Sequence, residues 1–460
     1  MSRTTHAYVM PERRTFARAP APLFTVLALL LVVSNSARAA EPPGLDGLDA
    51  LYPSLDTLYL DLHRNPELSL HEGRTAAEMA ARLRATGFEV TEHVGGTGVV
   101  GVLRNGPSPT VLVRTDMDAL PMKEQTWLPF SSAISTRNDA GETVPVMHAC
   151  GHDIHMTSWV GAATLLARHR ERWSGTLVFV GQPAEEVLQG ADQMVRDGLF
   201  TRFPKPDFVV GLHVSNLIPS GRVGIPAGPA SAASNSVDIT FYGRGGHGAA
   251  PQTTIDPVLI AARAVVALQS IVSREVNPFD PAVVTVGTFH AGTKRNIIPD
   301  EAKLELTVRS YKPEVQKQLL AAIERIVKAE AAAGGAPRPP QIVVDPRETS
   351  EVVVNDPALA ARLSSALRRG LGDANVVPHE PASSSEDFGV YGRVAGVPSV
   401  QIRVGATAPK ELAAAAKEGR FVPGPHNSRF APDREPTIRT GVAAFTLSVL
   451  ELLGRPAGIP

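Results

Sequence analysis

The chain has 460 residues and a formal net charge of −1, and 43% of its residues are hydrophobic and 20% charged. This length allows more than one domain, and the composition is that of an ordinary soluble globular protein. Because the net charge is close to zero, no overall basic field favours binding to nucleic acid.

The N-terminus has the three parts of an export signal. Arginines precede an apolar run over residues 23–33, and a small-x-small cleavage site follows at residues 37–39. The run is too short for a stable transmembrane helix, so an uncleaved membrane anchor is the weaker alternative. Arg13 and Arg14 also resemble a twin-arginine signal, which leaves the general and twin-arginine export routes open. We therefore expect residues 1–39 to be a signal peptide, no stable membrane anchor to remain, and the mature protein to be periplasmic or secreted.

The mature chain opens with two helical segments. They are predicted over residues 45–64 and 75–86, and Gly87 is a C-cap signal for the second. Short valine-rich runs then alternate with helices, which is the pattern of an α/β sheet with helices on both faces. The predicted strands are 99–103, 110–114, 176–180, 208–212 and 399–404.

Acidic residues and a histidine follow three of these strands. Asp116 and Asp118 follow the second strand. Glu185 and Glu186 follow the third, and His213 stands at the end of the fourth. In open α/β sheets, ligands bind beyond the carboxyl ends of the strands. The sequence therefore predicts that these side chains meet at one rim of the sheet.

A second unit is predicted inside the first. Residues 231–349 give the order strand, helix, strand, strand, helix, strand, which is the ferredoxin-like split arrangement. Sequence with charged and histidine motifs resumes after it. We therefore predict a catalytic domain in two parts, 41–230 and 350–460, interrupted by a smaller inserted domain.

The single cysteine of the chain lies in a histidine-rich segment. Cys150 is two residues from His152, and a thiolate and an imidazole at that spacing reach one metal ion if the backbone is extended or turning. A lone cysteine cannot form an internal disulfide, so it serves packing, reactivity or ligation. An unpaired thiol is also a liability in an oxidising compartment unless something protects it. His155 could be a further ligand, but it lies where a helix is expected to start, which favours a structural role for it.

A hydrolytic metal centre needs ligands, an open position for water and a base that is not a ligand. The candidate ligands are Cys150, His152, Glu186, His213 and His426. Five ligands suit either two ions or one ion with a flexible ligand, and the donors favour zinc while leaving manganese, cobalt and nickel open. Glu185 is then the natural base. Asp118 is either a partner that fixes the tautomer of a ligand histidine or an ordinary loop aspartate.

The inserted unit carries three further candidates. His247 lies in a glycine-rich segment that lacks the context of a dinucleotide-binding fingerprint, and it could polarise a substrate carbonyl. Asn296 and Arg309 could bind a substrate carboxylate, arginine through its forked donor geometry. Each has an ordinary alternative as a loop or surface residue.

These motifs together resemble the M20 metallopeptidase family, in particular its amidohydrolase branch of N-acyl amino acid hydrolases. The matching segments cover nearly the whole mature chain and are 63–68, 114–121, 147–155, 182–186, 211–214, 245–251, 296–299, 385–388 and 425–427. The resemblance implies a catalytic domain with a mixed sheet flanked by helices. It also implies that the inserted domain is a ferredoxin-like lid used in dimerisation, and hence a homodimer or larger homo-oligomer.

The resemblance also implies roles for individual residues. The five candidate ligands match the metal ligands of that branch, and Glu185 matches its general base. His247 matches a lid histidine that in relatives completes the active site, sometimes across a dimer. Two segments depart from the commonest pattern: residues 131–146 are longer than usual, and residues 305–307, before the lid arginine, are larger than usual.

The expected reaction is metal-dependent hydrolysis of the amide bond of N-acyl amino acids, including aryl-acyl ones, which releases a carboxylic acid and an amino acid. A carboxypeptidase or dipeptidase with the same centre is the close alternative. A hydrolase that uses Cys150 as its nucleophile is a further one. A binding protein that kept only the fold would be expected to lack a ligand or the base, and all six residues are present.

Overall fold

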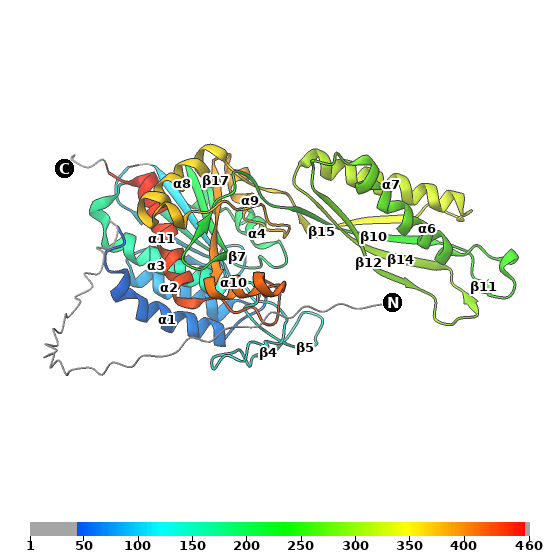
Figure 1. Ribbon diagram of the computed structural model, residues 1–460, viewed down its shortest axis with the longest axis horizontal. Coiled ribbons are helices and arrows are strands. Elements are labelled where there is room, and N and C mark those ends of the chain that lie inside the picture. The colour runs from blue at the N-terminus through cyan, green and yellow to red at the C-terminus, as the bar shows by residue number, and fades with distance from the viewer. Residues whose placement is uncertain (1–43, 108, 456–460) are drawn as a thin grey trace, which may run out of the picture. The chain divides into compact units, whose positions relative to one another are not determined.

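The computed structural model describes residues 44–107 and 109–455 (Figure 1). The predicted signal peptide lies outside the described residues. Within them, the strands form a seven-stranded sheet, a four-stranded sheet and three two-stranded ribbons.

The seven-stranded sheet is mixed, with the order β1-β2-β6-β3-β7-β17-β8. Neighbours among β6, β3, β7 and β17 are parallel, and the remaining pairs are antiparallel. Its strands are β1 (Glu89–Glu92), β2 (Val99–Arg104), β3 (Thr110–Asp116), β6 (Thr176–Gln182), β7 (Phe208–Pro219), β8 (Val223–Gly224) and β17 (Ser399–Thr407). The carboxyl ends of the four central strands therefore meet at one edge, as the polar motifs predict.

Helices cover both faces of this sheet. Side chains alternate between the two faces along each strand, and apolar residues on both faces need a covering layer. On β3, Val111 and Val113 belong to one core cluster and Leu112 to another on the opposite face. The first face carries α1 (Leu48–Arg64), α2 (Gly73–Ala85), α3 (His152–Arg168), α8 (Pro357–Leu371) and α11 (Arg434–Leu453). The second carries α4 (Gly190–Arg196), α5 (Leu199–Arg202) and α9 (Gly389–Ala395).

The inserted domain has its own sheet and core. Its strands are antiparallel in the order β12-β14-β10-β15, so the first and third strands in sequence lie at the centre, as in the ferredoxin-like arrangement. The elements are β10 (Ala233–Tyr242), α6 (Pro257–Ser270), β12 (Ala282–Ala291), β14 (Glu301–Ser310), α7 (Pro313–Ala333) and β15 (Gln341–Ser350). Both helices pack on the sheet through a separate apolar cluster.

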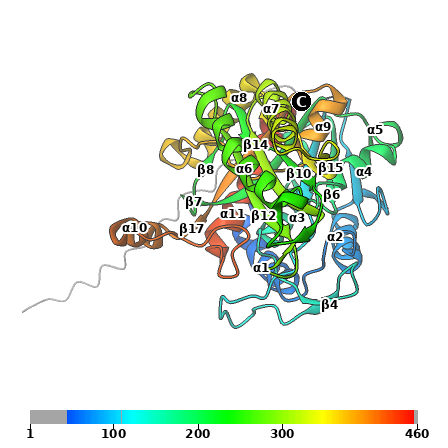
Figure 2. The ribbon, with the colours of Figure 1, turned by 90° about the vertical axis from the view of Figure 1, so that its right-hand side faces the viewer.

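Shorter elements join and extend the two domains. The ribbons pair β4 (Ser135–Arg137) with β5 (Thr143–Pro145), β9 (Gly228–Ser231) with β16 (Val353–Asn355), and β11 (Gly246–His247) with β13 (Ile297–Ile298). The β4–β5 ribbon lies in the long segment before the cysteine and projects at the same end of the catalytic domain as α1 (Figures 1 and 2). The helix α10 (Pro409–Glu418) and single turns at Arg170–Arg172, Pro251–Thr253, Ile271–Glu275 and Asp373–Asn375 complete the set.

Several boundaries differ from the sequence prediction, and two of these differences position candidate ligands. The strand predicted to end at residue 212 continues to Pro219, because β17 pairs with it along that length. His213 therefore lies within β7 rather than at its end. The helix expected to start near His155 begins at His152, directly after Gly151, whose φ of 84° marks the turn.

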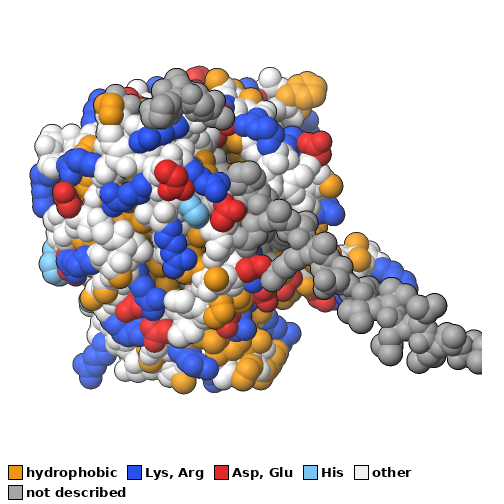
Figure 3. Space-filling model, turned by 90° about the vertical axis from the view of Figure 1, so that its left-hand side faces the viewer, with side chains coloured by type: hydrophobic (Ala, Val, Ile, Leu, Met, Phe, Trp, Pro, Cys, Tyr) orange, Lys and Arg blue, Asp and Glu red, His pale blue; other side chains and the backbone are white. Residues whose placement is uncertain are grey.

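Two helical stretches, Pro257–Glu275 and Arg434–Leu453, are long and apolar enough by composition to cross a membrane. The second is largely buried in the core of the catalytic domain, where such composition is common. The first packs on the lid sheet and exposes Leu259 and Val266. On the face of the molecule in Figure 3, basic and acidic side chains are interspersed, as the near-zero net charge suggests.

Candidate metal centre

Two elements, α3 and β7, and three loops bring the candidate ligands together at the rim. Ligand atoms of Cys150, His152 and His213 lie within 4.8 Å of one another. The same holds for Cys150, Glu186 and His426. It also holds for His152 with Glu185 and Glu186. These overlapping groups share members, so the five predicted ligands form one cluster.

The turn at Gly151 sets the position of the first two ligands. Its positive φ is unfavourable for residues with a side chain, and a Cβ there would lie 2.8 Å from Cγ2 of Val214. Glycine therefore lets the chain reverse between Cys150 and the first turn of α3. His426 also has a positive φ, and its backbone N–H donates to the carbonyl of Ala149, which ties its loop to this turn.

The thiol of Cys150 and the ring of His213 face each other, and the lone-pair nitrogen of the ring points toward the sulfur, as in two ligands of one metal ion. The thiol sulfur lies 3.4 Å from Nε2 of His213, whose Nδ1 donates to the carbonyl of Val214 and so leaves Nε2 as the lone-pair nitrogen. Burial, followed by His155 and Arg403, holds the pKa of His213 well below its usual range. Burial and neighbouring carboxylates raise the pKa of Cys150 well above its usual range, so a thiolate there requires a nearby cation.

His152 presents its Nε2 to three carboxylates. Its Nδ1 donates to the backbone carbonyl of Asp118 over 2.8 Å. Its Nε2 lies 3.7 to 3.8 Å from oxygens of Asp116, Glu185 and Glu186. Burial disfavours the protonated ring, but the charge of Asp116, followed by Asp118 and Glu186, raises the pKa of His152 to about 10.

A divalent metal ion fits this donor set. Among the described residues, Nε2 of His152 and Oε1 of Glu186 are buried without a hydrogen-bond partner. A buried polar atom of this kind is costly unless something satisfies it, and both atoms face the cluster. One sulfur, three imidazole nitrogens and a carboxylate are donors that zinc accepts.

Asp118 contacts two of the candidate ligands. Its backbone carbonyl holds His152, and its carboxylate accepts from the backbone N–H of Glu186 over 2.9 Å and from the Ser69 hydroxyl over 2.6 Å. Burial opposes ionisation, but the hydrogen bond with His152 leaves the pKa of Asp118 below its usual value. These contacts favour the interpretation of Asp118 as the residue that orients a ligand histidine.

Glu185 lies beside the ligands in a different environment. Burial, followed by the charges of Glu386, Glu186 and Asp387, raises the pKa of its carboxyl well above the usual range. Its Oε2 is 3.7 Å from Nε2 of His152. A carboxyl with a raised pKa next to a metal cluster is suited to accept and return a proton.

A buried arginine supports this carboxylate cluster. Arg114 forms ion pairs with Asp116 at 2.6 Å, Glu386 at 2.9 Å and Asp387 at 3.1 Å. These residues lie in or beside the matching motifs 114–121 and 385–388, but the motifs alone predict no role for them. The signal in the sequence is an arginine inside a strand that is predicted to be buried. A charge there requires buried partners of opposite charge.

His155 has the structural role expected of it. Its Nδ1 donates to Asp116 over 2.7 Å, and its Nε2 accepts from the backbone N–H of Val214 over 3.0 Å. Both ring nitrogens are therefore occupied, although His155 lies within 4.8 Å of ligand atoms. It joins β3 and β7 beneath the cluster.

Two of the three lid candidates lie side by side, and the third is distant from them. His247 pairs with Ile297 in the β11–β13 ribbon, and the carbonyl of Asn296 accepts from the N–H of Gly248. Arg309 is at the other end of β14, opposite Ser234 at the start of β10. The ten residues of β10 span roughly 30 Å, so His247 and Arg309 lie at opposite ends of the lid sheet.

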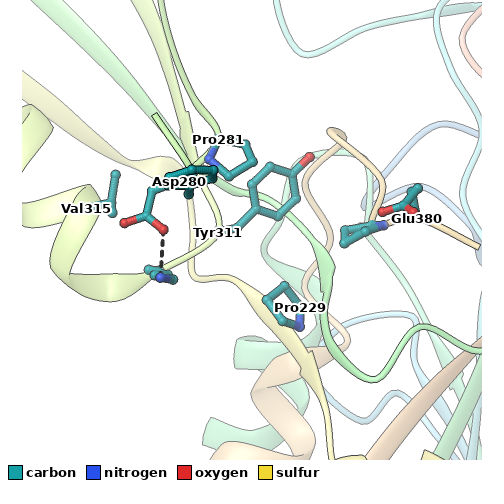
Figure 4. A pocket seen from close by; sticks show the side chains of 9 residues that line it. Pro229, Asp280, Pro281, Tyr311, Val315 and Glu380 are labelled. Atoms are coloured by element: carbon teal, nitrogen blue, oxygen red, sulfur yellow. Dashed lines mark ion pairs between the residues drawn. The ribbon is translucent and has the colours of Figure 1, made fainter. Parts of the chain in front are cut away.

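A cavity of about 360 Å³ lies where the lid joins the catalytic domain (Figure 4). It is lined by Pro229, Phe279, Asp280, Pro281, Tyr311, Lys312, Val315, Glu380 and Pro381. Lys312 and Asp280 form an ion pair of 2.7 Å beside it. None of the candidate ligands lines this cavity, so it is distinct from the metal cluster.

Similar proteins agree with this architecture. The chain is 40% identical over 332 residues to the hippurate hydrolase of Campylobacter jejuni, with 72% of this chain and 82% of that one covered. It is 35% identical over 394 residues to thermostable carboxypeptidase 2 of Saccharolobus solfataricus, with 85% and 93% covered. A solved dinuclear metal-binding peptidase of the M20 family from Bacillus subtilis superposes with a TM-score of 0.71 at 29% identity, with 88% and 100% covered.

The model of peptidase family M20/M25/M40 matches residues 112–423, which include four of the five candidate ligands and the whole lid. The remaining ligand, His426, lies three residues after the end of the match. On the geometry of the cluster and this match, the chain is a hydrolase that belongs to peptidase family M20/M25/M40.

Proposed function

We propose that the protein hydrolyses the amide bond of N-acyl amino acids, including aryl-acyl ones, and releases a carboxylic acid and an amino acid. The observation that carries the proposal is a five-ligand cluster with a separate carboxyl, Glu185, beside it. The similarity to a hippurate hydrolase supports an N-acyl amino acid as the substrate.

Cys150, His152, Glu186, His213 and His426 would hold one or two divalent ions, with zinc favoured by the thiolate and imidazoles. An ion held by these residues would supply Lewis acidity, which would polarise the amide carbonyl and lower the pKa of water toward about 7. Glu185 accepts a proton from the attacking water as the oxygen bonds to the amide carbon. It then delivers that proton to the nitrogen as the carbon–nitrogen bond breaks.

The lid residues complete the proposed site. His247 would donate to the developing oxyanion, and Asn296 and Arg309 would bind the substrate carboxylate. Because His247 and Arg309 lie at opposite ends of one lid sheet, a single lid cannot present both to one small substrate. Asn296 lies beside His247, so we propose a homodimer or larger assembly in which a partner's lid contributes both His247 and Asn296. The apolar side chains that α6 exposes, Leu259 and Val266, support an association surface on the lid.

We also propose that the protein acts outside the cytoplasm, because residues 1–39 have the pattern of a signal peptide. Export would leave the single cysteine in an oxidising compartment. Ligation of a metal ion by Cys150 would protect the thiol there.

The test is hydrolysis of N-benzoyl and N-acetyl amino acids and of dipeptides by the purified mature protein, with chelator and with zinc or manganese added back. Loss of activity with chelator and its return with metal would support the proposal. Activity that survives complete metal removal but not thiol alkylation would instead identify Cys150 as a nucleophile.

A second candidate is peptide hydrolysis by the same centre. The similarity to a carboxypeptidase over 85% of this chain favours it. The two candidates separate in the same assay, since a peptidase would release amino acids from dipeptides at least as fast as from N-acyl amino acids.

A further inference from the structure

Trp127 is held in an unusual backbone conformation at the surface. Its φ is 56°, in the left-handed region that large residues with a side chain rarely adopt, and its side chain is 77% exposed. An exposed ring adds little to the core, so core packing does not explain this conformation. Backbone strain of this kind persists only where the surroundings impose it, and it concentrates at functional sites.

The loop that carries Trp127 is fixed on both sides. The carboxylate of Glu124 contacts Nε2 of His63 at 3.2 Å and accepts from the N–H of Ser132 over 2.7 Å. The N–H of Gln125 donates to the carbonyl of Ser428 over 2.7 Å. The loop therefore presents its exposed ring from a rigid base.

Both anchors lead directly to candidate metal ligands. His63 contacts Asp153 at 2.6 Å, and Asp153 follows the ligand His152 in the chain. Ser428 stands two residues after the ligand His426. The loop of Trp127 is therefore tied to the two segments that carry the candidate ligands His152 and His426.

Arg429 fixes the ring from the side of the His426 loop. Its guanidinium lies 5.2 Å from the centre of the Trp127 ring, within the range of a cation–π contact. The other side of the ring is available, because more than three quarters of the side chain is exposed. A planar aromatic group is the ligand that such a held ring binds best, by stacking or edge contact.

We propose that Trp127, held by Arg429, contacts the aromatic acyl group of the substrate and makes the enzyme prefer aryl-acyl over short aliphatic amides. This inference rests on the proposed N-acyl amino acid hydrolysis. The candidate residues for the substrate carboxylate, Asn296 and Arg309, belong to the lid, so the amino acid portion faces the lid. The acyl group then falls on the catalytic-domain side of the scissile bond, where Trp127 lies.

The first experiment compares kcat/KM for N-benzoyl-phenylalanine and N-acetyl-phenylalanine. Trp127→Gly suits the positive φ, so the fold is preserved while the ring is lost. We expect kcat/KM for the benzoyl substrate to fall about three- to tenfold, the range of one aromatic contact, with the acetyl substrate unchanged. Trp127→Phe should restore most of the loss. Phe279→Ala removes a 90% exposed aromatic from the lid and serves as the matched control.

An equal loss on both substrates, or no loss on either, would overturn the proposal. If the wild-type protein hydrolyses neither compound, the proposed function fails, and a binding measurement then decides the role of Trp127 on its own.

That measurement uses fluorescence. The chain has three tryptophans, and Trp159 and Trp173 are fully buried, so acrylamide quenching reports mainly on Trp127. In metal-loaded protein carrying Glu185→Gln, N-benzoyl-phenylalanine should protect the emission from acrylamide and N-acetyl-phenylalanine should not. Equal quenching in the presence of the two compounds would refute the contact.

Discussion

At the scale of single residues, two adjacent glutamates are given different tasks by their surroundings. Glu186 is held by Asp118 through its backbone N–H and contacts His426 at 3.1 Å, so it points into the ligand cluster. Glu185 faces Glu386 and Asp387, whose charges help to raise its pKa. The contrast makes one a candidate ligand and the other a candidate base, and this assignment can be tested residue by residue.

Glu185→Gln should leave the bound metal unchanged and lower kcat by roughly 100- to 10,000-fold, because the amide keeps the shape but cannot accept a proton. Metal content by elemental analysis and steady-state kinetics check both parts. A variant that keeps substantial turnover would remove Glu185 from the role of base.

Cys150→Ser should lower zinc content, since a hydroxyl is a much poorer ligand for zinc than a thiolate. Activity should return in part when excess manganese is supplied, because manganese accepts oxygen ligands. The rival in which Cys150 is the nucleophile predicts that no metal restores turnover. Unchanged zinc content would contradict the ligand assignment.

At the scale of elements, the site depends on the residue at which α3 begins. It also depends on how α1 and the loop before Cys150 contact this helix. Sequence patterns located the strands, and hence the rim, because buried valine runs alternate clearly with helices. They placed the start of α3 three residues too late, because the helix follows a left-handed turn at Gly151, and Val214, the residue that excludes a side chain there, is distant in the sequence. Arg114 lies 272 and 273 positions before two of its carboxylate partners, Glu386 and Asp387, and no local pattern reports such contacts.

Gly151→Ala should lower the free energy of unfolding by roughly 2 to 4 kcal/mol, since it adds both left-handed strain and a contact with Val214. Thermal and urea unfolding measure the loss, and metal content should fall with it. Gly335→Ala is the matched control: Gly335 has a φ of 69° but open space around it, so only the strain is added. Equal losses in the two variants would show that the contact with Val214 is unimportant.

His63 should make stability depend on pH. Burial opposes its charge, but Asp153 and Glu124 outweigh burial and raise its pKa to about 9. The other facing groups, Tyr59 and His148, stay neutral, because burial raises the pKa of the phenol well above its usual value and lowers that of His148 to about 4. The stabilisation is fully present below the unfolded pKa of about 6.5.

As the pH rises through 9, His63 loses its proton and about 3 kcal/mol of stability is lost. Urea unfolding of the wild-type protein and of His63→Gln at pH 6, 7.5 and 9 tests this. The wild-type protein should lose stability over that range, and the variant should show a flatter dependence. Parallel curves would exclude His63 as the source.

At the scale of the whole molecule, the lid and the catalytic domain have separate cores, and the candidate residues are divided between them. The sequence predicted this division, because the strand and helix order changes where the insertion begins. The motifs in the sequence did not predict that His247 and Arg309 lie at opposite ends of the lid sheet. Their distance follows from strand pairing rather than from spacing in the chain.

Mixed assemblies test the proposed contribution of a partner's lid. His247→Ala and Glu185→Gln should each be inactive alone, but co-expression should restore about one quarter of wild-type activity. Half of the dimers formed at random are mixed, and each has one intact site. Activity of co-expressed samples against each separate variant measures the effect. No recovery in demonstrably mixed dimers would place His247 outside the partner's site.

The order of the ligands along the chain has a consequence for how the protein matures. The cluster begins with Cys150 and ends with His426, and β17, which completes the centre of the sheet, follows the whole lid. Such distant pairings form late and slowly, and exposed intermediates are prone to aggregate. The nascent chain thus has no complete metal site until nearly all of it has been synthesised. Metal insertion is thereby a final step, in whichever compartment the finished chain folds.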